Sequence, residues 1–278
     1  MSIFNTIESS TATHYFKQSQ LDHARSLKRL SSGSKHSTPS SDGGALSVSL
    51  SLNSSKSQLK SIEGSIQNAI AYLEVQDGLM ENAGKIFLRV QELYGLFQSD
   101  PLKAEGGSEQ SLYDAEFNEL QEQYEQIKGS SFNGNALFVD MWGDDDEEIT
   151  IRVSPDGNQE ISIKRQDLDY SLGGVLGGQN WTVTSLSEID EDDIEIDMED
   201  FSAIRTENAS SRKQLSIIAE SLSRQKVSTS RALERVDSVD IAFGLASLAK
   251  SSIMLNSSAS MLAQANFSTD RVEALLGI

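Results

Sequence analysis

The sequence feature that most constrains the fold is a long stripe of apolar residues that begins at Leu59. Its members recur at steps of three and four residues, and only Gln76 is polar: Leu59, Ile62, Ile66, Ala69, Leu73, Gln76, Met80, Ala83, Phe87, Val90, Tyr94 and Phe97. This average spacing of 3.5 residues is what helices need in order to pack side by side along their length. The stripe therefore predicts a helix of roughly 58 Å, at about 1.5 Å per residue, with a partner along it.

Two further stripes have the same spacing. One is Tyr113, Phe117, Leu120, Tyr124 and Ile127, and the other is Leu215, Ile218, Leu222, Gln225, Thr229, Ala232, Val236, Val239, Phe243 and Ala246. Pro101 and the turn at 105–107 separate the first two stripes, so we expect the second helix to fold back on the first. The third stripe comes from the other half of the chain, which predicts that both ends join one bundle.

The segment 141–200 has a different character, with 18 acidic and 3 basic residues. Ile149, Ile151 and Val153 alternate with polar residues before the turn at 155–158, and Ile161 and Ile163 alternate after it, which predicts a β-hairpin. Further alternating runs at 181–186 and 194–198, with glycine pairs at 173–174 and 177–178 between them, extend the prediction to a small β-rich insertion. We expect this insertion to project outward from the bundle.

The two ends of the chain are poor in apolar residues. Residues 1–57 contain 17 serines, and the final segment from Ile253 also mixes apolar residues with many serines and asparagines. Serine lowers helical tendency and supplies no core. Each end by itself is expected to be marginally ordered and to gain order on meeting a partner.

Charge and composition exclude several classes of function. The formal net charge is −19, which disfavours nucleic acid and anionic membrane surfaces as partners. The absence of cysteine removes disulfides, thiolate nucleophiles and cysteine-bound metals. No apolar run approaches the roughly 20 residues of a spanning helix, and no secretory signal is recognisable at the N-terminus.

Enzymatic and metal-binding motifs are also missing. The three histidines lie within the first 36 residues and form no H-E-x-x-H pair, and the glycine-rich run at 173–178 lacks the features of a P-loop or dinucleotide site. The acidic clusters at 144–148 and 188–200 lack the spacing of an EF-hand loop, so we interpret them as a solvated face. The sequence predicts no enzyme, no catalytic residue, no metal and no cofactor.

Several short motifs resemble the bacterial flagellin family. At the N-terminal end these are Lys28-Arg29-Leu30-Ser31-Ser32-Gly33 and the run 41–48, followed by the turn Phe132-Asn133-Gly134. At the C-terminal end the run 260–266 reads SMLAQAN. The resemblance covers about residues 1–140 and 201–278. It departs from the family pattern at 34–44, where Pro39 is present and one acidic residue is missing.

The resemblance implies a structural subunit that polymerises with copies of itself into the bacterial flagellar filament for motility. It implies export through the flagellar type III channel to a secreted, extracellular location, with a chaperone at the C-terminal segment and the filament cap and hook-junction proteins as partners. The expected fold is mainly α, an elongated antiparallel bundle whose termini form a coiled coil. The expected segments are an inner coiled coil (1–43, 236–278), a long-helix bundle (44–140, 201–235) and the acidic outer insertion (141–200).

The candidate subunit-interface residues are Leu27, Leu30, Arg89, Leu93, Glu116, Phe243, Met261 and Leu262. Among them, Leu27, Leu30, Phe243 and Met261 belong to the thin apolar stripes of the chain ends. Arg89, Leu93 and Glu116 match flagellin positions that contact neighbouring subunits and a vertebrate Toll-like receptor, so the resemblance also implies a receptor contact there.

Two other functions fit parts of the sequence. Pro39 is a feature nearer to hook–filament junction proteins, which share the terminal architecture. A secreted adhesin-like protein would instead use 141–200 as a binding surface on a helical stalk, and it predicts ordering of that segment by Ca²⁺.

Overall fold

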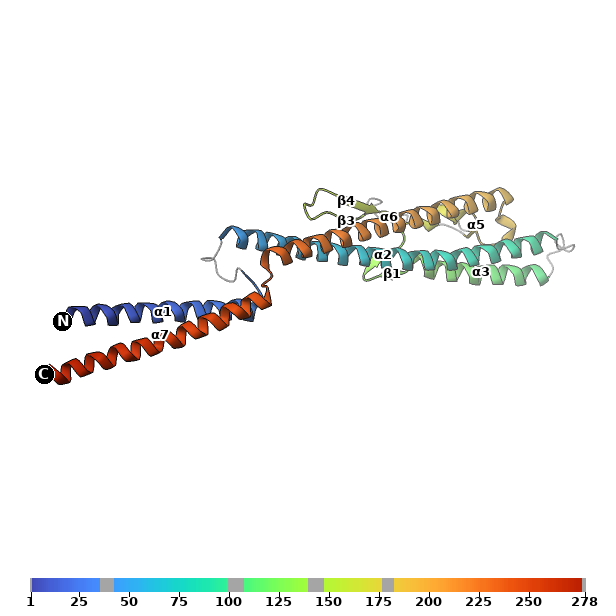
Figure 1. The fold of residues 1–278 in the computed structure, drawn as a ribbon. Coiled ribbons are helices and arrows are strands. Elements are labelled where there is room, and N and C mark those ends of the chain that lie inside the picture. Colours follow the sequence, from blue (N-terminus) through green and yellow to red (C-terminus); the bar gives the residue numbers. More distant parts are fainter. Residues whose placement is uncertain (1, 36–42, 100–107, 140–147, 177–182, 277–278) are drawn as a thin grey trace. The chain divides into compact units, whose positions relative to one another are not determined.

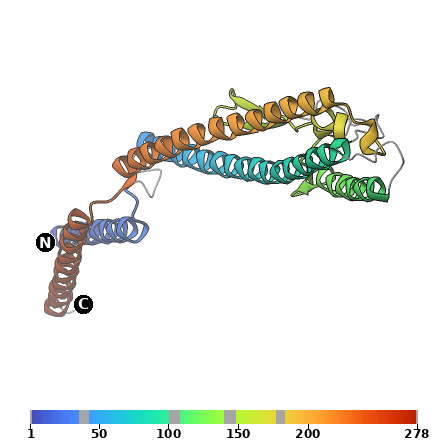
Figure 2. The ribbon, with the colours of Figure 1, turned by 90° about the vertical axis from the view of Figure 1, so that its right-hand side faces the viewer.

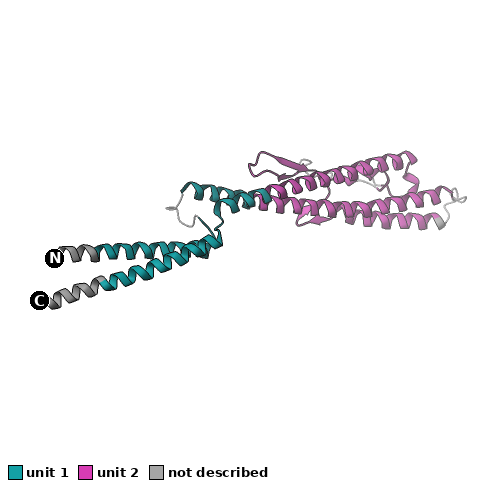
Figure 3. Ribbon diagram, in the orientation of Figure 1, with its two compact units in different colours: residues 1–57, 227–278 teal, residues 58–226 magenta. Residues whose placement is uncertain are grey.

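The computed structural model describes residues 2–35, 43–99, 108–139, 148–176 and 183–276, and for 2–9, 108–109 and 265–276 it describes the backbone alone. The predictions about Pro39, Pro101, the turn at 105–107, the acidic run 144–147, the glycine pair 177–178 and Trp181 lie outside the described residues. The chain divides into two compact units, residues 1–57 with 227–278 and residues 58–226 (Figure 3).

The first unit is built on a pair of helices from the two ends of the chain. These are α1 (Ser2–Ser32) and α7 (Ile241–Leu276), which lie side by side (Figure 1). They run antiparallel, because Leu30 lies against the backbone of Gly244 and the hydroxyl of Ser26 meets that of Ser247 at 3.4 Å. The predicted pairing of the termini is confirmed, and both ends are helical.

The side chains that this pair covers recur at steps of four and three residues, as in a coiled coil. They are Ala12, Phe16, Ser19, His23, Ser26 and Leu30 on α1 and Gly244, Leu248, Ser251, Leu255, Ser258 and Leu262 on α7. Half of these positions carry serine, alanine or glycine. The seam is therefore close and thin, and it buries little apolar surface.

A small clasp closes the inner end of the pair. The Ser34 hydroxyl donates to the Asp237 carboxylate at 2.6 Å, and the Lys35 amide donates to the Asp237 carbonyl at 2.7 Å. Beside it, the Asp240 carboxylate accepts hydrogen bonds from the amides of Ala242 and Phe243 and so caps α7. The preceding apolar stripe ends at this cap. The buried residues of the new helix do not continue the spacing of that stripe.

The second unit, residues 58–226, is a bundle around the part of α2 (Gly43–Ser99) that begins at residue 58. Its neighbours are α3 (Ser108–Lys128) and α6 (Glu191–Asp237), which lie along α2 in both views (Figures 1 and 2). Both run antiparallel to α2, since α3 turns back along it (Figure 1), and on α6 Arg205 pairs with Asp77 while the later Lys226 pairs with the earlier Glu63. The predicted fold-back and the joining of both chain halves are confirmed.

The stripe that begins at Leu59 is the core of this unit. Every one of its positions is buried or half-buried, and the stripe on α3 is likewise covered. Gln76, the polar exception, is fully buried and donates to the Leu137 carbonyl at 2.7 Å. Its side-chain oxygen accepts from Asn208 on α6, also at 2.7 Å, so the interruption is a buried polar pair between two helices.

The turn at Asn133-Gly134 closes a short hairpin of β1 (Ser131–Phe132) and β2 (Asn135–Ala136). Both turn residues have positive φ, 51° and 85°, which is the geometry of a two-residue hairpin and explains why Asn and Gly stand there. The Tyr72 hydroxyl donates to the Ala136 carbonyl at 2.9 Å. The hairpin is thereby fixed to α2.

The middle of the chain contains the predicted β-hairpin. Strands β3 (Ile149–Arg152) and β4 (Glu160–Ile163) pair antiparallel, with Ile151 opposite Ile161 and Gly157 at φ 71° in the turn. After β4 the chain forms three short helical elements: α4 (Leu168–Ser171), α5 (Gly173–Leu176) and the 3₁₀ turn η2 (Leu186–Glu188).

The run 194–198 is the first part of α6, so the prediction of a strand there is wrong. Its apolar residues alternate, but the buried positions are Ile194, Asp197 and Phe201, at steps of three and four. Three acidic residues, Glu191 to Asp193, occupy the first turn and stabilise the positive end of the helix dipole. A polar residue at the buried position 197 hides the helical stripe from a pattern search.

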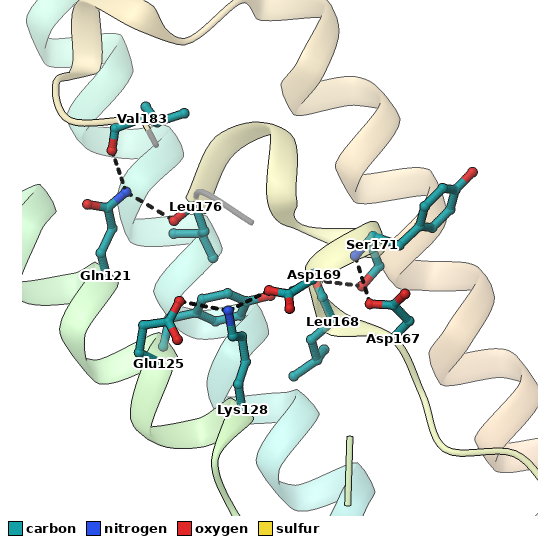
Figure 4. Close-up of polar contacts among 11 residues, drawn as sticks. Gln121, Glu125, Lys128, Asp167, Leu168, Asp169, Ser171, Leu176 and Val183 are labelled. Atoms are coloured by element: carbon teal, nitrogen blue, oxygen red, sulfur yellow. Dashed lines mark hydrogen bonds and ion pairs between the residues drawn. The ribbon is translucent and has the colours of Figure 1, made fainter. Parts of the chain in front are cut away.

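The described middle segment also packs inward. Along α3 it makes a series of polar contacts: Lys128 to Asp169, Tyr124 to the Leu168 carbonyl, and Gln121 to the carbonyls of Leu176 and Val183 (Figure 4). Its apolar residues Leu168, Leu172, Val175, Leu176, Leu186 and Ile189 join the core of the unit. Residues 168–176 and 186–189 therefore form a layer of the bundle, in contrast to the expected outward projection.

Candidate assembly interface

The outer surface of the α1–α7 pair carries many exposed apolar side chains. They are Tyr15, Leu21 and Leu27 on α1 and Ile241, Phe243, Leu245, Ile253, Met254 and Met261 on α7. Phe243 is the most exposed of them, at 75%. Exposed apolar surface of this extent is typical of a site that contacts another protein.

The pair thus has an unusual division of residue types. Serine, glycine and alanine occupy half of the seam positions between the helices, while nine large apolar residues in the described part of the pair are exposed outside it. Each large apolar side chain contributes roughly 1.5 to 3 kcal/mol when it is moved from water into a packed interior. The arrangement leaves that contribution available to contacts with other molecules.

The predicted interface residues of this unit fall into two groups. Leu27, Phe243 and Met261 are exposed and available to another molecule. Leu30 and Leu262 are half-buried positions of the α1–α7 seam. Phe243 was expected to continue the stripe of the preceding helix, but the cap at Asp240 changes the helical phase and turns Phe243 outward while Gly244 faces α1.

The remaining exposed apolar residues of the pair are not among the predicted interface residues. They are Tyr15, Leu21, Ile241, Leu245, Ile253 and Met254. Their signal is present in the sequence, because the described part of α7 has apolar residues around its whole circumference. A helix that is apolar all round is normally buried on all sides. Within the described part of the chain, this helix has a partner on one side.

The second unit holds the other predicted residues, Arg89, Leu93 and Glu116. The Arg89 guanidinium lies 2.7 Å from the Glu116 carboxylate and 2.7 Å from that of Glu92. Hydrogen bonds to Glu116 and then to Glu92 raise the pKa of Arg89 above its usual value. Arg89, Glu92 and Glu116 form a partly exposed ion-pair network across α2 and α3.

Leu93 differs from Arg89 and Glu116, because it is fully buried, with 0% of its surface exposed. It lies outside the predicted stripe on α2, yet α2 is covered by both α3 and α6, so a wider part of its surface is buried. Tyr72 and Ile86 are buried outside the stripe as well. The structure assigns Leu93 to the core and leaves its side chain no surface for a neighbour or a receptor.

The second unit also contains buried charges. Lys128 is 11% exposed and Asp169 2%, and they form an ion pair, while Lys128 also contacts Glu125 at 2.7 Å (Figure 4). Asp197 accepts a hydrogen bond from the Val175 amide at 2.8 Å, and burial raises its pKa to about 6. These groups fix the middle segment to α3 and α6.

Metal ions and membranes are two other kinds of partner that clustered acidic residues or long helices can have. Among the described residues, no group of three or more histidine, aspartate or glutamate side chains is arranged to hold a metal ion. No helix within the described ranges combines the length and apolar character that crossing a membrane requires.

Long antiparallel helices, a thin seam between the chain ends and an apolar outer surface define a class of protein, the helical structural subunits of polymers. The family model of the bacterial flagellin N-terminal helical region matches residues 3–142. The chain belongs to the bacterial flagellin family, and it is a structural subunit of the flagellar filament.

Relatives support this assignment over most of the chain. A flagellin of Halalkalibacterium halodurans is 22% identical over 254 residues, covering 91% of both chains. A flagellar filament 31.3 kDa core protein of Treponema maltophilum is 21% identical and covers 92% of this chain and 93% of its own. A solved Vibrio parahaemolyticus protein, named as a candidate flagellar hook-associated protein, shares the fold with a TM-score of 0.59 and 13% identity, covering 71% of this chain and 100% of its own.

Proposed function

We propose that this subunit joins the filament by packing the exposed apolar surface of its α1–α7 pair against the same pair in neighbouring copies. The observation that supports the proposal is the division of residues in the pair, with small side chains in much of the seam and large apolar side chains exposed outside it. Contacts between different patches of identical subunits give an open helical polymer when the rotation from one subunit to the next does not close a ring.

In this proposal Leu27, Phe243 and Met261 contact neighbours directly, and Leu30 and Leu262 hold the pair together beneath them. Arg89 and Glu116 form a secondary, polar contact on the second unit, where they are also the candidate contacts of a Toll-like receptor. A further part of the proposal is that the subunit leaves the cell through the flagellar type III channel, with an export chaperone on its C-terminal segment. The subunit then acts outside the cell, next to the cap and hook-junction proteins, and has no catalytic role.

The test is seeded polymerisation of the purified protein in ammonium sulfate, observed by negative-stain electron microscopy. Salting out strengthens apolar association, so the wild-type protein is expected to form long uniform filaments. The variant Phe243→Ser/Met261→Ser is expected to remain monomeric with unchanged helical content. Leu112→Ser is the matched control, since Leu112 is similarly exposed but lies on α3.

Truncation tests the same proposal more severely. Removal of residues 1–30 or 250–278 deletes one partner of the pair, and the product is expected to be a soluble helical monomer that does not polymerise. Efficient filament growth by either truncated protein would contradict the proposal. Wild-type protein that forms only short oligomers on filament ends would instead favour the hook–filament junction function, and ordering of 141–200 by millimolar Ca²⁺ would favour the adhesin.

A further inference from the structure

The second unit has an open groove on the surface that α2 and α6 share. Two adjoining hollows form it, and both are lined by Met198, Ser202 and Thr206 of α6. Apolar contributions come from Ile194, Ala203 and Ala209 of α6 and from Gly84 and Leu88 of α2. A groove with such a floor between two helices is suited to bind the exposed face of a third helix.

The groove has a rim of one charge at the start of α6. Glu191, Glu195 and Glu199 line it, and within the described ranges none of them has a lysine or arginine within ion-pair distance. The other acidic residues of the groove have basic partners, because Asp77 pairs with Arg205 at 3.3 Å, Glu81 with Lys85 at 2.7 Å and Glu207 with Lys164 at 3.7 Å. Among the described residues, no ion pair compensates the negative charge of this rim, which lies beside an apolar floor.

The complementary surface lies on α1. Residues 17–35 contain five basic side chains and one acidic side chain, in a chain whose net charge is −19. Arg25 pairs with Asp22 at 3.1 Å, whereas Lys17, Lys28 and Arg29 are exposed and have no acidic partner among the described residues.

The positions of these residues on the helix form one stripe. Lys17, Leu21, Ala24 and Lys28 are separated by steps of four and three residues, so they share one face of α1. All four are exposed, and this face lies away from the seam with α7. The stripe presents an exposed leucine between two lysines, which matches an apolar floor beside a row of glutamates.

We propose that the α2–α6 groove of one subunit binds the Lys17–Lys28 face of α1 from a second copy of this chain. Identical subunits with this much negative charge repel one another. A contact between a basic patch and an acidic patch offsets that repulsion at the surfaces that meet. The contact sets which surface of one copy meets which surface of the next. This inference rests on the proposed filament function and adds a second interface to it, in which Leu21 contacts the groove while the other exposed apolar residues of the pair contact neighbouring pairs.

Charge reversal tests the pairing. Glu195→Lys/Glu199→Lys and Lys17→Glu/Lys28→Glu are each expected to raise the protein concentration needed for filament growth about tenfold or more, because each places like charges together. The protein that carries all four substitutions restores opposite charges and is expected to regain growth near the wild-type concentration. Glu119→Lys/Glu122→Lys, two exposed glutamates on α3, is the matched control and should change that concentration much less.

A disulfide test locates the contact directly, since the chain contains no cysteine. Ala24→Cys on the α1 face and Ser202→Cys in the groove, placed in one chain, are expected to give a ladder of covalent oligomers when filaments are oxidised. Each single variant should give no ladder, and Ala24→Cys with Ala115→Cys on α3 should give none either.

The outcomes separate the two proposals. If wild-type filaments form but charge reversal has no effect, or the fourfold variant is not restored, the groove pairing is wrong and the filament proposal stands. Absence of the ladder in intact filaments also overturns the pairing, as does a cross-link confined to a single chain. If the wild-type protein forms no filaments at all, the filament proposal fails, and the cysteine pair tested at high protein concentration decides the groove pairing by itself.

Discussion

The α1–α7 pair and the α2 bundle use the same spacing of three and four residues but fill it with different side chains. In the α2 bundle the repeating positions hold leucine, isoleucine, methionine and phenylalanine, and they are buried within one chain. In the α1–α7 pair half of these positions hold serine, alanine or glycine, and further large apolar residues are exposed outside the seam. The spacing determines that the helices pair. The side chains at the repeating positions determine whether the apolar surface of the pair is buried within one chain.

The difference has a consequence for stability. The large apolar residues of the second unit are buried when a single chain folds. Their burial therefore stabilises this unit without a second copy. A seam with many small residues gives the α1–α7 pair less stability of its own, and we expect its remaining apolar surface to become buried when copies associate. Under this proposal, stability and assembly depend on separate parts of one chain.

The largest expected effect comes from breaking the apolar seam. Phe87→Ala removes a ring that is 1% exposed in the core of the bundle, and it is expected to lower the free energy of unfolding by about 3 to 5 kcal/mol. Leu88→Ala is the matched control, because the neighbouring side chain is 54% exposed and should cost less than about 0.5 kcal/mol. Urea denaturation followed by circular dichroism measures both, and equal effects would contradict the assignment of the seam.

A smaller effect on stability is expected from the buried carboxyl of Asp197, which lies in the α2 bundle. Its pKa is raised from 3.8 to about 6 in the folded protein, chiefly by burial, so the folded state holds a proton that the unfolded state has already lost. This contribution to stability is present below about pH 4 and is lost as the pH rises through about 6.

The Asp197→Asn variant isolates this term, since other carboxyl groups titrate over the same range. Relative to the wild-type protein, the variant is expected to become more stable as the pH is raised from about 4 to about 7. Urea unfolding at both pH values gives the difference. A difference that does not change with pH would show that Asp197 titrates in the folded protein as it does in the unfolded chain.

The smallest effect is expected in the α1–α7 pair. A Cβ at Gly244 would lie 2.8 Å from a methyl group of Leu30 and 3.3 Å from one of Val239, so Gly244→Ala must displace Leu30. The gain in helix propensity offsets part of the cost of displacing Leu30, and the stability of the α1–α7 pair is expected to fall by about 1 kcal/mol. Hydrogen exchange of the α1 and α7 amides measures it.

Gly78→Ala on α2 is the control for that substitution. Nothing lies within 4 Å of its new Cβ, so only the gain in helix propensity of about 1 kcal/mol remains. Slower exchange in the α1–α7 pair of Gly244→Ala, rather than faster exchange, would mean that the helices are not in close contact at this position.

The sequence predicts the α2 seam, the fold-back of α3, the β3–β4 hairpin and the turn at 132–134, because spacing and turn residues are local signals. It does not reveal the start of α6, where the buried residue at the helical spacing is Asp197, and its pattern places Phe243 in a stripe that the Asp240 cap ends. Leu93, expected at an interface from the resemblance, is fully buried in the core, and the stripe on α2 does not indicate its burial because α2 is covered on two sides. These properties depend on tertiary contacts that no window of the sequence contains.

The buried pair of Gln76 and Asn208 has a consequence for the polymer as a whole. A purely apolar seam could slip by one heptad, about 10 Å, and still bury similar surface. Slippage here would separate the two amides and leave each buried without its partner, which costs more than the apolar contacts that it keeps. The pair therefore fixes the register of α2 against α6, and with it the length of the bundle, in every copy of the subunit.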